Sequence, residues 1–201
     1  MQPNIVSLRN VNAQPWKNGG GVTFPLLCWP TERDWALRIS VAQIDRDGPF
    51  SVFPQIHRFI TTLDGDGIRL GAPLNIELRP GAPVLAWPGE IAPHCTLIGN
   101  VTRDLNAMVD SKRAKGWMRD VEGSVGDSSI FDLSEEKMRP SVCGFFTLGR
   151  ARLIDAGALV ELPEATLVWS EQQTGQAGDS KAWRIEGKER LWSFQCSLVA
   201  Q

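Results

Sequence analysis

The sequence predicts an all-β sandwich or barrel. Strand-like runs recur about every eight to twelve residues and are separated by turn residues, as in the segment Asp64-Gly65-Asp66-Gly67. Residues 35–42 alternate strictly, with Trp, Leu, Ile and Val on one face and Ala, Arg, Ser and Ala on the other. Helical periodicity is not convincing in any segment, and a short turn near Leu133–Lys137 is the one helical expectation.

The expected strands follow one another along the whole chain. In the first half they cover residues 35–42, 59–63, 68–70, 75–78, 84–87, 96–98 and 105–109. In the second half they cover residues 143–148, 158–162, 166–170, 183–186 and 192–199. Turn signals rich in Gly, Pro and Asp recur between these apolar runs. The polar, Gly- and Ser-bearing stretch from Asp110 to Pro140 is expected to be a connection, partly a loop.

A short pattern occurs twice. From Thr62 and again from Thr147, the chain reads Thr-Leu, a turn, a strand, Glu-Leu and an apolar run that ends in Trp. Either a β-unit is duplicated, or two short hairpins have converged on similar residues. Duplication implies two similar halves, residues 1–110 and 111–201. Because each half alone is small for a stable core, we expect them to fold as one compact unit.

Composition excludes several classes of protein. The chain has 201 residues and a mass of 22.2 kDa, which suits one large domain or two small, tightly packed halves. Hydrophobic residues at 42% and charged residues at 22% are ordinary for a soluble globular protein. The formal net charge of -2 gives no electrostatic reason to expect nucleic acid or an acidic membrane surface as a partner.

The N-terminus and the cysteines indicate a cytoplasmic protein. Residues 1–9 read MQPNIVSLR, and no long apolar stretch follows, so we expect neither a signal peptide nor a membrane span. The four cysteines include no C-x-x-C pair, and most lie inside apolar runs, which is typical of buried free thiols. We therefore expect a reduced environment.

Residues 15–23 (PWKNGGGVT) are the most informative stretch. Three consecutive glycines allow a positive φ or a close backbone approach that a Cβ would forbid. Beside them stand an amphipathic aromatic residue, a flexible cation and an amide that both donates and accepts hydrogen bonds. This mixture favours a recognition loop over a plain turn.

Four motifs together resemble those of a known family. They are residues 15–23 (PWKNGGGVT), 35–44 (WxxRISxAxI), 48–58 (GPFSxFPxxxR) and 104–108 (DLNxM). In this order and spacing they resemble the HutD/Ves family, whose members occur with histidine-utilisation genes and in related bacterial settings. The match is strong over the first half of the chain and rests on strand pattern alone in the second.

The resemblance implies a double cupin-like β-barrel (a bicupin), with two β-units packed as one compact unit. It also implies a cytoplasmic location and no established catalytic activity. The chain departs from the family in two places. His57 stands where many relatives carry an acidic residue, and the connection from Asp110 to Pro140 is longer than usual.

Cupin barrels often hold a metal, but this chain has few ligands for one. Such a site needs several imidazoles and a carboxylate that converge at about 2.0–2.2 Å from the ion. The chain contains only two histidines, His57 and His94, and no His-x-His pair. We therefore expect no metal and no other cofactor; an all-carboxylate site is conceivable but has no support in the sequence.

Cations of the first half are candidates for binding an anion. Arg38 lies among small residues on one strand face, which leaves room for a guanidinium that could bind a carboxylate through two hydrogen bonds. Alternatively, it forms a structural ion pair with a strand neighbour such as Asp104, or points outward. Trp16 and Lys17 could line the same pocket; otherwise Trp16 plugs one end of a barrel and Lys17 is solvated.

The remaining candidates are polar residues of the other motifs. Ser51 could act as a nucleophile only with His57 as its base, and no G-x-S-x-G motif surrounds it. Arg58 could face the pocket or solvent. Asp104 and Asn106 are two residues apart and share one face of an extended strand, where they complete a pocket or form a satisfied buried network. The full candidate set is Trp16, Lys17, Asn18, Thr23, Arg38, Ser51, His57, Arg58, Asp104 and Asn106.

Three functions compete at this stage. The first is a metal-free protein that binds a carboxylate-bearing metabolite, with a regulatory role in amino-acid catabolism. The second is a metal-independent isomerase or hydrolase that uses the same pocket, with Lys17, His57 or Asp104 as the acid–base group. The third is a protein-interaction module whose apparent pocket is ordinary core. The sequence leaves the oligomeric state open, with a homodimer through strand edges as one option.

Overall fold

The structure, a computed structural model of the chain, describes residues 3–121, 129–132, 141–172 and 182–199. It is all-β, as the sequence predicts. Within these ranges the chain forms strands and a short 3₁₀ helix, η1 (Leu8–Asn10), but no α-helix. None of the described segments is a helix long and apolar enough to cross a membrane. The turn expected near residues 133–137 lies outside the described residues.

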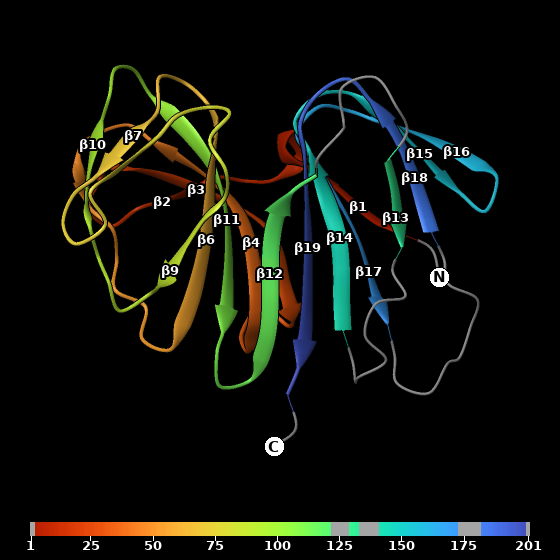
Figure 1. Cartoon of the computed structure of the whole chain (residues 1–201), viewed down its shortest axis with the longest axis horizontal. Coiled ribbons are helices and arrows are strands. Elements are labelled where there is room, and N and C mark those ends of the chain that lie inside the picture. The colour runs from red at the N-terminus through yellow and green to blue at the C-terminus, as the bar shows by residue number, and fades with distance from the viewer. Residues whose placement is uncertain (1–2, 122–128, 133–140, 173–181, 200–201) are drawn as a thin grey trace. The chain divides into compact units, whose positions relative to one another are not determined.

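The chain divides into two compact units (Figure 1). The N-terminal unit is Val11–Trp117, and the C-terminal unit combines Met1–Asn10 with Met118–Gln201. The first ten residues therefore belong with the second unit. The expected division into halves at residues 110 and 111 remains a prediction about domains.

The N-terminal unit contains ten strands in two sheets. These are β2 (Gln14–Pro15), β3 (Gly21–Pro30), β4 (Trp35–Ile44), β5 (Gly48–Pro49), β6 (Ile56–Asp64), β7 (Ile68–Leu70), β8 (Ile76–Leu78), β9 (Leu85–Pro88), β10 (His94–Leu97) and β11 (Thr102–Asp110). The larger sheet has the order β2-β3-β4-β11-β6-β9, and the smaller sheet has the order β5-β10-β7-β8. All the strand pairs are antiparallel.

The remaining strands form two further sheets. They are β1 (Asn4–Ser7), β12 (Ala114–Asp120), β13 (Ser129–Asp132), β14 (Ser141–Thr147), β15 (Ala151–Asp155), β16 (Ala158–Leu162), β17 (Thr166–Gln172), β18 (Ala182–Gly187) and β19 (Leu191–Leu198). One sheet has the order β1-β17-β14-β19-β12, and the other has the order β13-β18-β15-β16. The first strand of the chain, β1, thus pairs with a strand near its end, β17.

The two units repeat one strand order. The run β4-β11-β6-β9 corresponds to β12-β19-β14-β17, and β5-β10-β7-β8 corresponds to β13-β18-β15-β16, with each strand number higher by eight. The two copies of the sequence pattern begin at equivalent places, at the ends of β6 and β14. The internal repeat is therefore present at the level of strand order.

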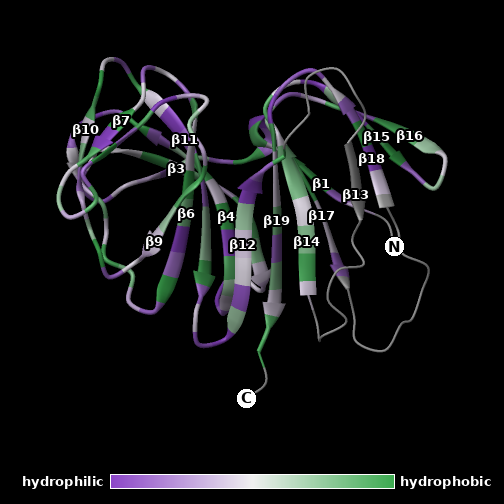
Figure 2. Cartoon of the chain, in the orientation of Figure 1, coloured by the Kyte–Doolittle hydropathy of each residue, from purple (hydrophilic) through white to green (hydrophobic). Residues whose placement is uncertain are grey.

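Each unit has its own apolar core. In the N-terminal unit it comprises Ile44, Ile60, Ile68, Leu70, Leu78, Trp87 and Cys95. In the C-terminal unit it comprises Phe145, Ala151, Leu153, Leu162, Val168, Trp183, Ile185 and Leu191. Figure 2 shows how burial follows composition along single strands: β14, buried throughout, contains no strongly hydrophilic segment, whereas the partly exposed β12 does.

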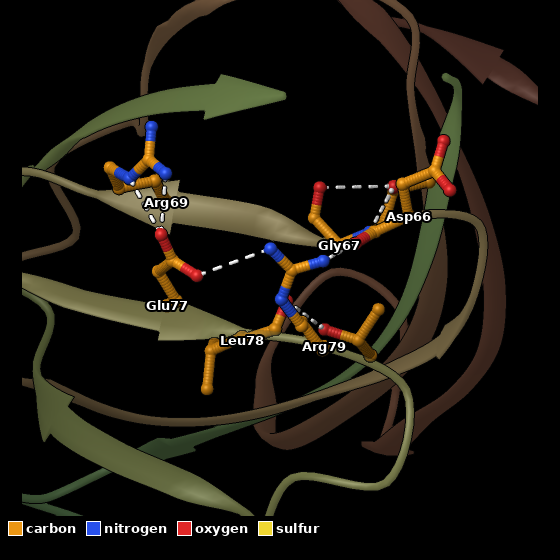
Figure 3. Close-up of polar contacts among 8 residues, drawn as sticks. Asp66, Gly67, Arg69, Glu77, Leu78 and Arg79 are labelled. Atoms are coloured by element: carbon orange, nitrogen blue, oxygen red, sulfur yellow. Dashed lines mark hydrogen bonds and ion pairs between the residues drawn. The ribbon is translucent and has the colours of Figure 1, made fainter. Parts of the chain in front are cut away.

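The hairpin of β7 and β8 carries an exposed cluster of charges (Figure 3). Arg69 and Glu77 are directly opposite one another in the register, and the Arg69 side chain donates two hydrogen bonds to Glu77 Oε1. Glu77 also accepts a hydrogen bond from Arg79, whose second amino group reaches the backbone oxygen of Asp66. These pairs are exposed to water, so we assign them to the surface of the hairpin rather than to a site.

Several strands were not expected from the sequence. β12 and β13 lie in the stretch from Asp110 to Pro140 that was expected to be a connection. β3 contains Pro25 and Pro30, which interrupt a strand pattern because proline cannot donate to the ladder. The sheet accommodates both prolines, since the register of β3 against β4 shifts after Pro25 and again before Pro30.

Candidate functional site

A cavity of about 400 Å³ lies within the N-terminal unit. Its lining comes from the loop that precedes β3, from one face of the larger sheet and from the segment between β4 and β6. Eight of the ten candidate residues line it: Trp16, Lys17, Asn18, Thr23, Arg38, Ser51, Arg58 and Asn106. His57 and Asp104 do not line it.

The glycine loop is fixed by its own hydrogen bonds. The backbone N–H groups of Trp16 and Gly19 donate to the carbonyl oxygens of Gly21 and Trp16 at 2.9 and 3.0 Å. The indole N–H of Trp16 donates to the hydroxyl oxygen of Thr23 at 2.8 Å, and the Asn18 side chain accepts from the Gly20 N–H at 3.0 Å. The loop therefore presents Trp16 and Asn18 to the cavity in defined positions.

Two of the three glycines are required for the reasons that the sequence suggested. Gly19 has a φ of 67°, in the left-handed region. A Cβ on Gly21 would overlap the carbonyl oxygen of Gln43 on β4, so the backbone of β3 approaches β4 there more closely than a side chain allows. The triple glycine thus combines a turn with a close approach between strands.

The register of the sheet aligns the two arginines of the cavity. Arg58 on β6 is directly opposite Met108 on β11, and Met108 is directly opposite Arg38 on β4. Residues opposite one another on paired strands project to the same side of a sheet. Their backbones are two strand spacings apart, about 10 Å. Two guanidinium groups therefore face one cavity with Met108 between them.

Arg58 is buried among aromatic rings. The residue is only 4% exposed. The guanidinium carbon lies 4.7 Å from the centre of the Phe50 ring, 5.0 Å from that of Trp87 and 5.6 Å from that of Phe53. Burial lowers the pKa of Arg58 to about 10; Asp104 opposes this shift and Arg38 adds to it. The side chain remains positively charged at neutral pH, and the rings help to stabilise that charge.

Arg58 also contacts two polar partners. One amino group donates to Asn106 Oδ1 at 3.3 Å, and the other donates to the backbone oxygen of Ser51 at 3.5 Å. Its Nε is buried and forms no hydrogen bond with any described residue. The sequence left open whether Arg58 faces the pocket or solvent; it lines the cavity.

Asp104 lies behind the cavity lining. It is 0% exposed, and its Oδ1 accepts a hydrogen bond from the Asn106 amide, while its Oδ2 has no partner among the described residues. Burial raises the pKa of Asp104 to about 8, and the nearby charge of Arg58 only partly offsets this. Asp104 and Asn106 share one face of β11, as expected. The sequence left open a structural ion pair between Asp104 and Arg38. Among the described residues, no such ion pair forms.

His57 and Ser51 are not brought together. His57 precedes Arg58 on β6, so its side chain points to the opposite face of the sheet, where its ring lies 4.9 Å from that of Phe59. Ser51 lines the cavity, but His57 does not, and neither does His94. The arrangement therefore offers Ser51 no histidine base.

The charges of the cavity lining are mostly positive. Lys17, Arg38, Arg46 and Arg58 line it together with one carboxylate, Asp47. The Asp47 side chain already accepts a hydrogen bond from the backbone of β10, at 2.8 Å. Such a lining favours an anion, because charge-assisted hydrogen bonds to guanidinium groups strengthen where water is excluded.

Arg46 and Met108 were not among the candidate residues. Arg46 lies in a segment that reads as a turn, and nothing in the sequence points it toward the cavity. Met108 could have been found, because it is two residues beyond Asn106 on the same strand face.

The described residues offer no cluster for a metal ion. Within residues 3–121, 129–132, 141–172 and 182–199, no group of three or more His, Cys, Asp or Glu side chains could hold one. The one cysteine of the cavity, Cys95, is buried, and burial raises its pKa to about 12, so it remains a neutral thiol. All four cysteines are free.

Sequence comparisons identify relatives in bacteria. A family model described as HutD matches residues 8–191. Protein Ves from Cronobacter sakazakii is 33% identical over 179 residues, which cover 88% of this chain and 83% of that protein. An uncharacterized 21.2 kDa protein in the hutC 3' region of Pseudomonas putida is 32% identical over 130 residues. That alignment covers 61% of this chain and 66% of the relative, just under two thirds of its length.

Solved structures share the fold. HutD from Pseudomonas fluorescens SBW25 (formate condition) has a TM-score of 0.79 at 22% identity, covering 99% of this chain and 100% of that chain. A cupin 2 conserved barrel domain protein from Leptotrichia buccalis has a TM-score of 0.53 at 11% identity, covering 98% and 96%. The fold of this all-β chain is therefore cupin-like.

Proposed function

The chain belongs to the HutD family, and we propose that it is a metal-free protein that binds a small carboxylate-bearing metabolite in the cavity of its N-terminal unit. Its role is regulatory, in the catabolism of an amino acid, and histidine is the first candidate. The link to histidine rests on the resemblance to the HutD/Ves family and on the hutC region named for one relative.

One observation carries the proposal: Arg38 and Arg58 project from the same sheet face into one cavity. Like charges in a partly desolvated space repel one another, and an anion between them relieves that repulsion. Lys17 and Arg46 add positive charge to the lining. Asn18, Thr23, Ser51 and Asn106 add polar groups, and the side chains of Asn18, Thr23 and Asn106 already form hydrogen bonds within the protein.

The finer architecture is part of the proposal. The repeated strand order supports two cupin-like halves, a bicupin, with the ligand site in the first half. We place the protein in the cytoplasm, in agreement with its free cysteines. A homodimer through strand edges stays an open alternative to a monomer.

A metal-independent enzyme that uses the same cavity is the second candidate. It is favoured by one observation, the raised pKa of about 8 for Asp104, since a carboxyl that titrates near neutral pH suits acid–base chemistry. Asp104 does not line the cavity, however, and Asn106 lies between it and Arg58. A binding role therefore accounts for more of the geometry than an isomerase or hydrolase does.

Thermal-shift screening tests the proposed function directly. Histidine, urocanate, formylglutamate and glutamate form the first panel. A true ligand at about 100 times its Kd stabilises the folded state by about 2.7 kcal/mol, which raises the melting temperature by several degrees. If none of the four raises the melting temperature or binds by calorimetry, the proposed ligand class is wrong.

Arg38→Lys is the sharper test. A lysine keeps the charge but cannot form two parallel hydrogen bonds, so we expect carboxylate affinity to fall about tenfold by calorimetric titration. The melting temperature should stay nearly unchanged, because no described residue forms an ion pair with Arg38. Arg69→Lys, which alters only the exposed hairpin of Figure 3, is the matched control and should keep wild-type affinity. A large loss of melting temperature with unchanged binding would instead make Arg38 structural.

A further inference from the structure

A buried polar chain of three side chains runs inward from the cavity. Arg58 donates to Asn106 Oδ1, and the Asn106 amide donates to Asp104 Oδ1. The orientation of the Asn106 amide is thereby determined, because its oxygen must face a donor and its NH₂ group an acceptor. Asp104, which has no contact with the cavity itself, is the group that holds the Asn106 oxygen toward Arg58.

Within this polar chain of Arg58, Asn106 and Asp104, two buried atoms have no hydrogen-bond partner among the described residues. They are Arg58 Nε and Asp104 Oδ2. A buried carboxylate with one amide donor is poorly stabilised, whereas a buried carboxylic acid is not, since most of the desolvation penalty falls on the charged form. Whether Asp104 carries a proton therefore depends strongly on the charges around it.

Few charges face Asp104 from the surrounding strands. From β4 the residue opposite is Ala42, and from β6 it is Thr62, whose hydroxyl donates to the Leu78 carbonyl. On β10, Cys95 interacts electrostatically with Asp104, but its thiol is neutral. Arg58 is the nearby cation that favours the ionised carboxylate. The other charged residues that line the cavity are Lys17, Arg38, Arg46 and Asp47.

From this arrangement we propose that Asp104 is a positioning residue that takes up a proton when an anion binds beside Arg58. The inference rests on the proposed anion site and adds to it a coupling between affinity and pH. A bound carboxylate neutralises the charge of Arg58, so the ionised form of Asp104 loses the nearby positive charge that favours it and gains a repulsive neighbour. The proton comes from solvent, and no covalent bond other than the O–H bond of Asp104 forms.

The coupling has a definite pH range. In the free protein the pKa of Asp104 is about 8, so below about pH 7 the carboxyl already holds its proton and binding takes up little more. Between pH 8 and the raised pKa of Asp104 in the complex, the free carboxyl is ionised and the bound one is protonated, so uptake approaches one proton per anion bound. There the apparent affinity falls by up to about tenfold per pH unit.

Calorimetric titration with glutarate in buffers of different ionisation enthalpy measures this uptake. Glutarate stays fully ionised over the range from about pH 6.5 to 9, so the protons counted belong to the protein. We expect uptake to rise from near zero to about one proton per glutarate over that range. In Asp104→Asn, a neutral side chain of the same shape, the uptake should vanish and the affinity should no longer fall with pH. Asp64→Asn makes the same change at an ion pair on β6 outside the cavity and should keep the wild-type uptake.

The outcomes separate the two proposals. Glutarate binding without proton uptake at any pH overturns the role of Asp104 and leaves the anion site intact. Failure of glutarate to bind at any pH overturns both. If Asp104→Asn does not fold, carbon-13 NMR of the wild-type Asp104 carboxyl decides: its titration midpoint must move upward when glutarate is added, and an unmoved midpoint in the bound protein overturns the inference.

Discussion

Burial places the Asp104 carboxyl in an environment where its ionised form is unfavourable, and folding stability must reflect this. An unfolded Asp has a pKa near 3.8, against about 8 in the folded protein. Between these values the folded state holds a proton that the unfolded state has released. Stability from this group is therefore complete at low pH, declines as the pH rises from about 4 to about 8, and is constant above that range.

Asp104→Asn removes this dependence. The variant should gain stability relative to the wild type as the pH rises, by up to about 1.4 kcal/mol per unit between pH 5 and pH 8. Urea unfolding of both proteins at pH 5, 7 and 9 measures the difference, and comparing the two cancels the groups that they share. A difference that does not change with pH would mean that Asp104 ionises in the folded state as an ordinary carboxyl does.

Single residues were predictable from the sequence where strand alternation alone decides which of them share a strand face. Arg38 was grouped with Ser40 and Ala42 on one strand face, and Asp104 with Asn106, because the alternation in β4 and β11 is clean, whereas the direction of each face was left open. Arg58 was not grouped in this way, because β6 begins at Ile56 rather than at the expected Phe59, and a residue outside an expected strand has no assigned face. The aromatic rings that surround Arg58 come from separate segments, which local patterns cannot bring together.

Among the elements, strands with an unbroken apolar pattern were found and irregular ones were missed. β4 was expected over residues 35–42 and is observed over Trp35–Ile44. β3 was missed because prolines interrupt its strand pattern. β12 was missed because Lys115, Gly116 and Arg119 interrupt its apolar residues. These strands are fixed by pairing with neighbours distant in the sequence, so tertiary context decides their conformation.

The glycine loop before β3 gives a prediction at this scale. Gly21→Ala should destabilise the protein by about 2 kcal/mol or more, because the new Cβ overlaps the Gln43 carbonyl oxygen and neither backbone can move freely. Gly20→Ala is the matched control: its Cβ would meet only the Asn18 side chain, at 3.3 Å, and should change stability by no more than about 0.5 kcal/mol. Chemical denaturation of both variants measures the difference. Equal losses would show that the approach of β3 to β4 is not a tight constraint.

At the scale of the whole molecule, the two units share a strand order but not the polar residues of the cavity. We take Thr62 and Thr147 as equivalent positions of the repeat. The equivalent of Arg58 is then Cys143. Arg58 is opposite Met108 in its sheet, and Cys143 is opposite Gln195. On the same basis Asp104 corresponds to Leu191. Phe145 and Trp183, with ring centres 6.0 Å apart, fill the core of the C-terminal unit. The sequence left the repeat open between duplication and convergence, and the register places Cys143 and Leu191 where the polar chain has Arg58 and Asp104.

The pairing of β1 with β17 predicts an effect of truncation far along the sequence. Deleting residues 1–7 removes β1 and leaves β17 with one strand neighbour, so amide hydrogen exchange should accelerate in β17 while β4 and β11 keep their protection. A deletion that ends before Asn4 spares β1 and is the control. Faster exchange in β4 and β11 instead would mean that the first residues support the N-terminal unit.

The same pairing joins two strands that are synthesised at widely separated times. Asn4 pairs with Trp169, so the first strand leaves the ribosome long before its partner has been made. At typical elongation rates the interval is about 10 to 30 s, which is long compared with the folding of a small domain. The N-terminal unit can form during that interval, while residues 4–7 (NIVS) have no strand to pair with. The sheet that contains β1 therefore cannot be completed before β17 and β19 have been made, and a nascent chain arrested before Thr166 has every residue of the cavity but none of the strand that β1 needs.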